Sequence, residues 1–337
     1  MTKTAVVILN YNGEKLLRQF LPTLLDYTAH AEIIVADNNS TDQSVALVRS
    51  QFPTVRLIIL DKNYGFCGGY NRALKEVHTR YSVLLNSDIE VTPNWLDPLI
   101  EMLDRDPSIA AVQPKILSYH TKKNFEYAGA AGGFIDSLGY PFCRGRIFTH
   151  IEEDRGQYDD EREIFWATGA CMAIRSETFQ QFQGFDEDFF AHMEEIDLCW
   201  KINRNNGKVY YCGKSKVYHV GAGTLGYESP KKTYLNFRNG LYLIFKHLDT
   251  GELILKFPLR ISLDWLAAFV FILKGQLKNC WAVLKAHKDF LNTLKITQRK
   301  RRLIRSAHPH YNSRNIFRGL VVFRYYILSK KNFSNPK

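Results

Sequence analysis

The stretch VLLNSD, residues 83–88, is the part of this sequence that says most about its fold. Its three leading apolar residues follow a polar, helix-like segment, which is the pattern of a buried strand. The acid Asp88 at the exit of that strand would lie at the rim of a sheet, where open α/β folds build their ligand sites. A carboxylate there can bind a hard divalent cation, which can in turn hold a diphosphate. The alternative is that Asp88 only caps a turn.

The rest of the N-terminal part alternates strand and helix patterns. Strands are predicted at residues 5–9, 33–36, 55–60, 83–85 and 109–112, with helices around 16–25, 45–48 and 71–77. Beyond about residue 115 the pattern is less regular, with strands at 164–174 and 209–219 and a helix near 194–203. This alternation predicts an α/β fold with a Rossmann-like, mostly parallel sheet flanked by helices.

The composition is that of a soluble globular protein. The chain has 337 residues, 45% of them hydrophobic and 23% charged, enough for one large or two modest domains. None of its six cysteines forms a C-x-x-C pair, which argues against a zinc ribbon or a redox dithiol. The first predicted strand begins within a few residues of Met1, so we expect no targeting segment and a cytoplasmic location.

Charge divides the chain into two parts. Residues 1–240 carry 26 Lys and Arg against 30 Asp and Glu, a net of −4, whereas residues 241–337 carry 19 against 4, a net of +15. The apolar stretch at 253–273 is interrupted by charges and is too short to cross a bilayer core of about 30 Å. Apolar helices interleaved with Lys and Arg predict a basic amphipathic region that attaches to an anionic membrane surface. The alternative is a helical subdomain with a solvated basic face.

Polar residues follow the predicted strands at four places. They are Asn10 and Asn12; Asp37, Asn39 and Asp42; Asn63, Gly65 and Asn71; and Asn86, Ser87 and Asp88. The carboxyl ends of parallel strands meet at one edge, so we expect these residues to converge. Asp37 can accept hydrogen bonds from a base or a sugar hydroxyl. The glycines of residues 63–71 let backbone approach a phosphate, although the segment matches neither the dinucleotide fingerprint nor the P-loop.

A fifth segment, FDEDFFAHMEEIDLCW at residues 185–200, combines many acids with aromatic residues. On a helix Glu194 and Asp197 share a face, while Glu195 points elsewhere. A carboxylate in apolar surroundings has a raised pKa, which suits a general base. His219, after a predicted strand, is a candidate metal ligand. The alternatives are a packed histidine and carboxylates that serve as helix caps or ion-pair partners.

Taken in this order, the segments resemble the family 2 glycosyltransferases, inverting enzymes of the GT-A fold, over roughly residues 3–240. VILNYN at 7–12 resembles the family's opening strand, and DNNSTD at 37–42 resembles its nucleotide-binding D-N-x-S-x-D. NYGFCGGYN at 63–71 resembles the N-x-G-F-x-x-G-x-N of the rhamnosyltransferase-like branch. WATGAC at 166–171 resembles the acceptor-side segment, which makes Trp166, Gly169 and Ala170 acceptor-side candidates.

Two positions depart from the family pattern. NSD at 86–88 stands where the family has its D-x-D metal motif, so Asp88 would carry most of the metal contact. EEID at 194–197 stands for E-D-x-D, which puts Glu195 at the position of the catalytic base, with Asp197 and Glu194 as the other candidates. His219 resembles the family's metal-proximal histidine.

The resemblance implies both an organisation and an activity. Residues 1–240 would form the GT-A domain, with a nucleotide-sugar half at 1–115, an acceptor half at 116–240 and the basic region at 241–337 behind them. With Mg²⁺ or Mn²⁺, the enzyme would transfer a sugar, rhamnose by the branch resemblance, from a nucleoside-diphosphate sugar to a hydroxyl of a saccharide. The acceptor would be carried on a polyprenyl diphosphate at the inner face of the cell membrane, in cell-surface polysaccharide synthesis.

Two other classes of protein remain as alternatives. A nucleotidyltransferase acting on sugar phosphates would carry a loop rich in Gly, Lys and Arg after its first strand, and NYNGE at 10–14 does not fit that pattern. A non-enzymatic nucleic-acid-binding protein would account for the net charge of +11, but no recognition module is visible. We therefore expect no nucleic-acid partner.

Overall fold

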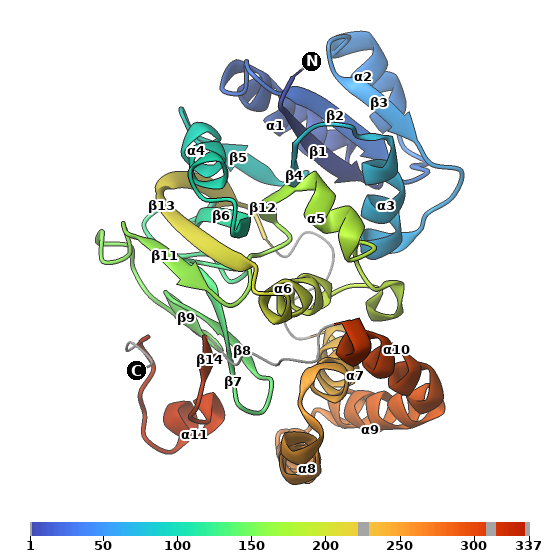
Figure 1. Cartoon of the computed structure of the whole chain (residues 1–337), viewed down its shortest axis with the longest axis vertical. Helices are drawn as coiled ribbons and strands as arrows, with labels where there is room; N and C mark the ends of the chain where they lie inside the picture. The colour runs from blue at the N-terminus through green and yellow to red at the C-terminus, as the bar shows by residue number, and fades with distance from the viewer. Residues whose placement is uncertain (1, 222–228, 308–314, 334–337) are drawn as a thin grey trace.

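The computed structural model describes residues 2–221, 229–307 and 315–333. Its centre is a nine-stranded sheet in the order β11-β13-β6-β12-β4-β1-β2-β3, with β5 paired to β13 (Figure 1). The strands are β1 (Thr4–Asn10), β2 (Glu32–Asp37), β3 (Arg56–Ile59), β4 (Tyr81–Asn86), β5 (Ile89–Val91), β6 (Ile109–Ser118), β11 (Glu161–Ile164), β12 (Cys171–Arg175) and β13 (Lys208–His219).

The N-terminal half of this sheet is parallel, as the alternating pattern predicts. Strands β3, β2, β1 and β4 all run in one direction, and Asn10 pairs with Asp37 while Leu9 pairs with Asn86. Successive residues of β1 enter opposite cores, with Val7 on one face of the sheet and Val6 and Ile8 on the other. The polar ends of β1, β2 and β4 therefore lie side by side at one edge.

The other half of the sheet is mixed: β6 and β13 pair parallel, whereas its other pairs are antiparallel. Strand β12 runs antiparallel between β4 and β6, and β11 and β5 run antiparallel to β13. The single strand predicted at 164–174 is two strands, because the chain leaves the sheet at Trp166, which bridges to Gly133. The break between β11 and β12 depends on pairing with strands far away along the chain, so the local sequence pattern cannot predict it.

Helices cover both faces of the sheet. They are α1 (Glu14–Asp26), α2 (Ser44–Gln51), α3 (Gly65–Ala73), α4 (Asp97–Arg105), α5 (Ser176–Gln181) and α6 (Glu194–Arg204), with 3₁₀ turns η1 (Leu74–Glu76) and η2 (Glu187–Phe189). Helix α1 buries Leu17, Leu21 and Leu24 in one core, a spacing that puts all three on one helical face. Helix α3 packs Tyr70 into the opposite core.

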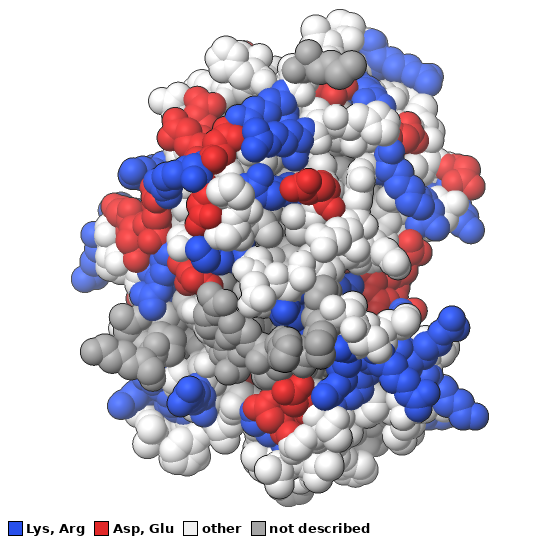
Figure 2. Space-filling model, in the orientation of Figure 1, with Lys and Arg blue, Asp and Glu red and all other residues white. Residues whose placement is uncertain are grey.

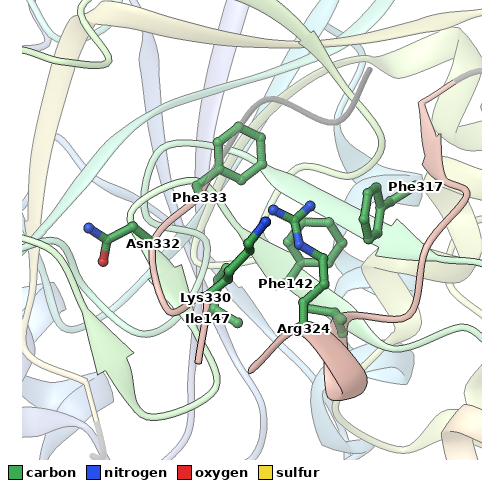
Figure 3. A pocket seen from close by; sticks show the side chains of 8 residues that line it. Phe142, Ile147, Phe317, Arg324, Lys330, Asn332 and Phe333 are labelled. Carbon is green, nitrogen blue, oxygen red and sulfur yellow. The ribbon is translucent and has the colours of Figure 1, made fainter. Parts of the chain in front are cut away.

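A second, five-stranded sheet is built from residues 133–151 and one strand of the C-terminal segment. It contains β7 (Gly133–Asp136), β8 (Pro141–Cys143), β9 (Arg146–Ile147), β10 (His150–Ile151) and β14 (Ile316–Phe317). Strand β14 pairs parallel to β7, so the C-terminal segment returns to this sheet. Phe142, Phe317 and Phe333, together with Arg324 and Lys330, line a small pocket there (Figure 3). This packing attaches the C-terminal segment to the second sheet.

The C-terminal region is helical, as predicted. Its helices are α7 (Pro230–His247), α8 (Thr250–Leu273), α9 (Leu277–Asn292), α10 (Leu294–Ala307) and α11 (Val321–Tyr326). Helices α7 to α10 pack together beneath α6 (Figure 1). The boundary expected at residue 240 falls inside α7, which continues through it without a break. In the described part of the chain, no helix has the length and apolarity needed to cross a membrane.

Candidate active site

The ends of β1 and β2 are locked together by buried polar side chains. The Asn10 amide donates to Asp37 Oδ1 at 2.9 Å and to Ser40 Oγ at 3.1 Å, and the Ser40 N–H donates to Asp37 Oδ2 at 2.8 Å. Asn12, with φ of 52°, accepts from the Thr41 N–H at 2.7 Å. These bonds fix residues 37–42 against the end of β1. The two predicted nucleotide-binding segments thus form one structure.

The neighbouring positions of this loop differ in their surroundings. Asp42 accepts from the Glu14 N–H at 3.0 Å, which ties the loop to the start of α1. Asn39 is exposed and has φ of 64°, a conformation that Asn tolerates better than most residues. Asn38, which sequence reasoning missed, is buried and donates to Asn63 Oδ1 at 3.1 Å and to the Gly65 carbonyl at 3.0 Å. The sequence does not distinguish Asn38 from Asn39, because the hydrogen-bond partners of Asn38 lie 25 or more residues away along the chain.

Asn71 connects the N-terminal half to the segment that precedes α6. Its amide donates to the Phe185 carbonyl at 2.8 Å, and its Oδ1 accepts from the Phe185 N–H at 2.8 Å. Both polar atoms of the Asn71 side chain therefore hold backbone. The sequence pattern assigns Asn71 to the nucleotide, whereas this geometry makes it a residue that fixes the acidic segment.

Asp88 and His219 meet at the end of β5 and β13, because Ile89 pairs with His219 in those strands. Asp88 Oδ1 lies 3.1 Å from His219 Nε2, and His219 Nδ1 lies 3.0 Å from Glu126 Oε2. All three side chains are buried. Burial by itself would lower the pKa of His219, but the two carboxylates raise it to about 10. Glu126 is a residue that sequence reasoning missed, because it follows β6 and lies far along the chain.

These side chains fit a Mg²⁺ or Mn²⁺ ion that shares its coordination with a substrate. Within the described residues there is no group of three or more His, Cys, Asp or Glu placed to hold a metal. Asp88 and His219 offer two ligands, and such ions commonly complete their shell with phosphate oxygens and water. An ion bound by Nε2 would replace the proton on His219, and Glu126 would then orient the ring. Asn86 and Ser87 lie at the end of β4 nearby, where the Asn86 N–H donates to the Ala170 carbonyl at 2.9 Å.

The segment before α6 is strained and held from the C-terminal region. Phe190, His192 and Met193 have φ of 64°, 67° and 71°, which is uncommon for residues other than Gly. The buried amide of Asn239 in α7 donates to the carbonyls of Phe189, Ala191 and His192 at 3.0, 2.9 and 2.7 Å. Strain that is fixed in this way tends to gather at functional sites.

Two carboxyl groups open α6 in surroundings that favour their protonated form. Glu195 is half-buried, and its Oε2 has no hydrogen-bond partner in the described structure. Burial raises the pKa of Glu195 to about 7, although backbone N–H groups at the start of α6 lower it in part. Burial and the charge of Glu195 also raise the pKa of Glu194. A carboxylate with a pKa near neutrality, and with a buried oxygen that no described group of the protein engages, has the properties of a general base.

Asp197 has the opposite character. It is fully buried and lies 2.6 Å from Lys246 Nζ, 2.8 Å from His247 Nε2 and 3.0 Å from Lys201 Nζ. Burial alone would raise the pKa of Asp197, but the charges of Lys201 and Lys246 hold it well below its ordinary value. Asp197 is therefore a permanent anion that ties α6 to α7, and its surroundings do not suit proton transfer.

The acceptor-side candidates Trp166, Gly169 and Ala170 make packing and backbone contacts in the structure that surrounds the acids of α6. Trp166 is buried against Gly133, and its Nε1 donates to the Phe134 carbonyl at 2.9 Å. Gly169 lies against Phe66, where a Cβ would approach the ring to 3.1 Å. The Ala170 carbonyl accepts from Asn86. These residues join the second sheet and β12 to the end of β4.

The parallel half with its polar strand ends, joined to a mixed half that carries the acids of α6, is a fold that solved glycosyltransferase structures share. S. aureus TarS 1-349 superposes with a TM-score of 0.57 at 18% identity, covering 91% of this chain and 87% of that one. GalNAc-T7, solved with UDP, GalNAc and Mn²⁺, gives a TM-score of 0.56 at 16% identity and covers 73% of this chain and 48% of that one. These similarities confirm the predicted GT-A fold.

The glycosyl transferase family 2 model matches residues 5–182, and the chain belongs to that family. The N-acetylglucosaminyl-diphospho-decaprenol L-rhamnosyltransferase of Mycobacterium tuberculosis is 24% identical over 320 residues, which are 90% of this chain and 98% of that protein. Rhamnosyltransferase WbbL of Escherichia coli is 24% identical over 221 residues, 64% of this chain and 82% of that protein. The predicted membership of family 2, in its rhamnosyltransferase-like branch, is confirmed. The chain is thus a glycosyltransferase.

Proposed function

We propose that this glycosyltransferase works with inversion and transfers a sugar, rhamnose in our proposal, to a saccharide carried on a lipid diphosphate. The donor would be a nucleoside-diphosphate sugar and the role cell-surface polysaccharide synthesis. The observation that carries the proposal is Glu195, whose pKa lies near 7 and whose Oε2 has no partner in the described structure. The name of the mycobacterial relative, which aligns with 90% of this chain, supports the lipid-linked acceptor. Membership of family 2 argues against both the nucleotidyltransferase and the nucleic-acid-binding alternatives.

The chemistry follows from the positions of the chain's own groups. The interlocked Asn10 and Asp37 shape the edge on which the nucleoside binds. Glu195 accepts the proton of the acceptor hydroxyl as that oxygen forms a bond to the anomeric carbon, while the bond from that carbon to the diphosphate oxygen breaks. A divalent cation held by Asp88 and His219 would neutralise the charge of the diphosphate. Because attack is direct and from the opposite side, the product has the inverted configuration.

The outer face of α8 supports the proposed attachment to an anionic membrane surface. This helix buries Arg260, Asp264 and Ala268, which are spaced four apart and so form one stripe. Large apolar side chains are exposed on the rest of it: Ile254, Leu255, Leu259, Trp265, Leu266, Phe269, Ile272 and Leu273. Lys and Arg gather nearby over the corner formed by α9 and α10 (Figure 2). An apolar face flanked by cations suits the interface of an anionic bilayer.

Co-sedimentation with vesicles tests this attachment. The double variant Trp265→Glu and Leu266→Glu changes only exposed positions and should fall to background on vesicles that contain phosphatidylglycerol. Substitution is a sharper test than removal of the region, because Lys246 and Lys300 from that region pair with Asp186. Sedimentation equal to that of the unchanged protein would contradict the attachment.

A transfer assay tests the proposed reaction. The purified chain is incubated with dTDP-, UDP- and GDP-sugars and a synthetic N-acetylglucosaminyl diphosphate that carries a short isoprenoid. We expect one donor to give a product whose anomeric configuration, read by NMR, is inverted, and we expect Glu195→Gln to slow its formation by about 10²- to 10⁴-fold. A product with retained configuration, or full activity in that variant, would overturn the mechanism.

A further inference from the structure

The short helix α11 presents a second apolar face to solvent. Four large apolar side chains at its end are about half exposed or more: Phe323 at 50%, Tyr326 at 66%, Ile327 at 67% and Leu328 at 48%. The first three stand at positions i, i+3 and i+4, which lie on one side of a helix. Val321 and Tyr325 face the other way, since Val321 is buried and the Tyr325 ring lies 5.0 Å from that of Phe148. Helix α11 is therefore amphipathic, with one face packed and one face open.

The packed face of α11 is held on the second sheet from both of its ends. Before the helix, β14 pairs with β7. Within it, the Tyr325 hydroxyl lies 3.1 Å from the Thr149 hydroxyl, and after it the ring of Phe333 lies 5.2 Å from that of Phe134. The exposed apolar residues thus belong to a fixed element of the fold. A contiguous apolar patch on such an element marks a place where a partner binds.

One turn of the second sheet joins α11 to α8. At the end of β7, the buried Asp136 Oδ2 accepts a hydrogen bond at 2.9 Å from the N–H of Val321, the first residue of α11. Two residues further on, the Leu138 carbonyl accepts one at 3.1 Å from Arg260 in α8. Both helices lie at the same end of the long axis of the molecule, on either side of the β7–β8 turn (Figure 1). The apolar residues of α11 and those of α8 are therefore presented at one end of the molecule.

The charge at this end of the molecule complements an anionic surface. Residues 315–333 contain four Lys and Arg and no Asp or Glu. Each of the four acids of residues 241–337 already has a partner: Asp249 pairs with Arg305, Glu252 with Lys256, Asp264 with Arg260, and Asp289 accepts from the Tyr234 hydroxyl. The lowest part of the face in Figure 2 is mostly uncharged, with Lys and Arg on both sides above it. Apolar residues with cations behind them match the acyl and headgroup layers of an anionic bilayer.

We infer that α11 is a second membrane-binding element, which inserts Phe323, Tyr326 and Ile327 into the interface of an anionic bilayer while α8 binds beside it. Tyr326 suits that depth, because its ring is apolar and its hydroxyl can stay in water. The inference rests on the proposed function, in which the acceptor is carried on a lipid. A second contact fixes the rotation of the molecule about α8, which one helix would leave free. The parallel half of the sheet would then point away from the bilayer, with α6 between the two (Figure 1).

Co-sedimentation of the full chain with vesicles compares the two apolar faces. The α11 variant, Phe323→Glu with Ile327→Glu, is measured beside the double variant of α8 described above. The matched control is Tyr27→Glu with Ile59→Glu, which adds the same charge at two exposed positions in the N-terminal half. The vesicles consist of phosphatidylcholine with or without phosphatidylglycerol, and melting curves show that each variant folds.

A fluorescent label reports on α11 directly. Five of the six cysteines are buried, so Cys280→Ser gives a chain in which one introduced cysteine can be labelled selectively. Ile327→Cys in that chain carries a dye whose emission shifts to the blue when it leaves water. Ile59→Cys with the same dye is the control.

We expect the α11 variant to weaken partitioning onto vesicles with phosphatidylglycerol by about tenfold or more, the effect of keeping one large apolar side chain in water. On the same vesicles the emission of the label at Ile327→Cys should shift to the blue, and that of the label at Ile59→Cys should not. The control with Tyr27→Glu and Ile59→Glu should bind like the unchanged protein.

Three results would overturn the role of α11. They are unchanged partitioning of a folded α11 variant, a label at Ile327→Cys that stays in water while the protein is bound, and a dimer of the unchanged chain that the α11 variant dissociates in analytical ultracentrifugation. The last would assign the apolar face to a second copy of the chain. Failure of the proposed attachment looks different, because the α8 variant would then bind vesicles like the unchanged protein. Failure of the proposed reaction would abolish sugar transfer and leave the vesicle results as they are.

Discussion

Glu195→Gln should make the protein less active and more stable, and the gain in stability should depend on pH. The substitution keeps the shape of the side chain and removes its charge. A general base contributes about 10²- to 10⁴-fold to turnover, so kcat should fall by that factor while donor affinity is unchanged. The stability effect arises because the pKa of Glu195 is about 7 in the folded protein and 4.5 ordinarily.

The sign and size of the stability effect follow from proton linkage. A carboxyl with a raised pKa binds its proton more tightly in the folded state, so its ionisation lowers the free energy of unfolding as pH rises from about 4.5 to about 7. At about 1.4 kcal/mol per pKa unit the ceiling is about 3 kcal/mol, and the half-buried position reduces this to about 1–2 kcal/mol. The advantage of Glu195→Gln should be small at pH 5 and complete at pH 8, a difference of about 2–5 °C in melting temperature.

The assay is a melting curve of both proteins at half-unit steps between pH 5 and pH 8. Glu194→Gln is the matched control, because Glu194 shares the burial and should gain stability in the same direction while it keeps more of the turnover. Asp197→Asn should lose stability instead, since it removes one of the two carboxylates that pair with buried Lys246. A melting difference between Glu195→Gln and the unchanged protein that does not vary with pH would refute this reasoning.

Three further predictions follow from the site. The kcat/KM of the unchanged enzyme should rise about tenfold per pH unit below about 7 and level off above it, since Glu195 must be ionised; a flat profile from pH 5.5 to 8 would exclude this base. Lys246→Met leaves buried Asp186 and Asp197 without a shared cation and should cost about 3–5 kcal/mol in urea unfolding, and a loss below about 1 kcal/mol would show that the cluster contributes little. Asn239→Asp removes the donor to three carbonyls of the strained segment and should lower kcat at least about tenfold with donor affinity unchanged, whereas an equal loss of both would indicate general unfolding.

The parallel half of the fold could be predicted because its strands are short apolar runs, three of which, β1, β2 and β4, end in a polar residue. The same local patterns also predicted that Asn10, Asp37 and Asp88 lie close together at the edge of the sheet. The mixed half could not be predicted, since β12 is placed between β4 and β6 by pairing across the chain. The change in net charge near residue 240 likewise marks no structural boundary, because α7 runs through it and supplies Lys246 and Asn239 to the acidic segment.

The roles of individual site residues could not be predicted, because they depend on interaction partners that lie far away along the chain. Glu194, Glu195 and Asp197 look alike in a run of acids, yet Asp197 has three cationic or imidazole partners and Glu195 Oε2 has none in the described structure. Two of those partners, Lys246 and His247, lie about 50 residues away along the chain. Glu126 was missed for the same reason, since only the fold brings it to His219.

Calorimetric titration of the purified protein with a panel of nucleotide sugars, with and without Mn²⁺, tests the central claim most directly. The account predicts that donors with one particular nucleotide bind to the folded protein, more tightly with Mn²⁺, and that Asp88→Ala removes the effect of the metal. Binding that is the same in Asp88→Ala and indifferent to Mn²⁺, or no binding of any donor, would contradict it.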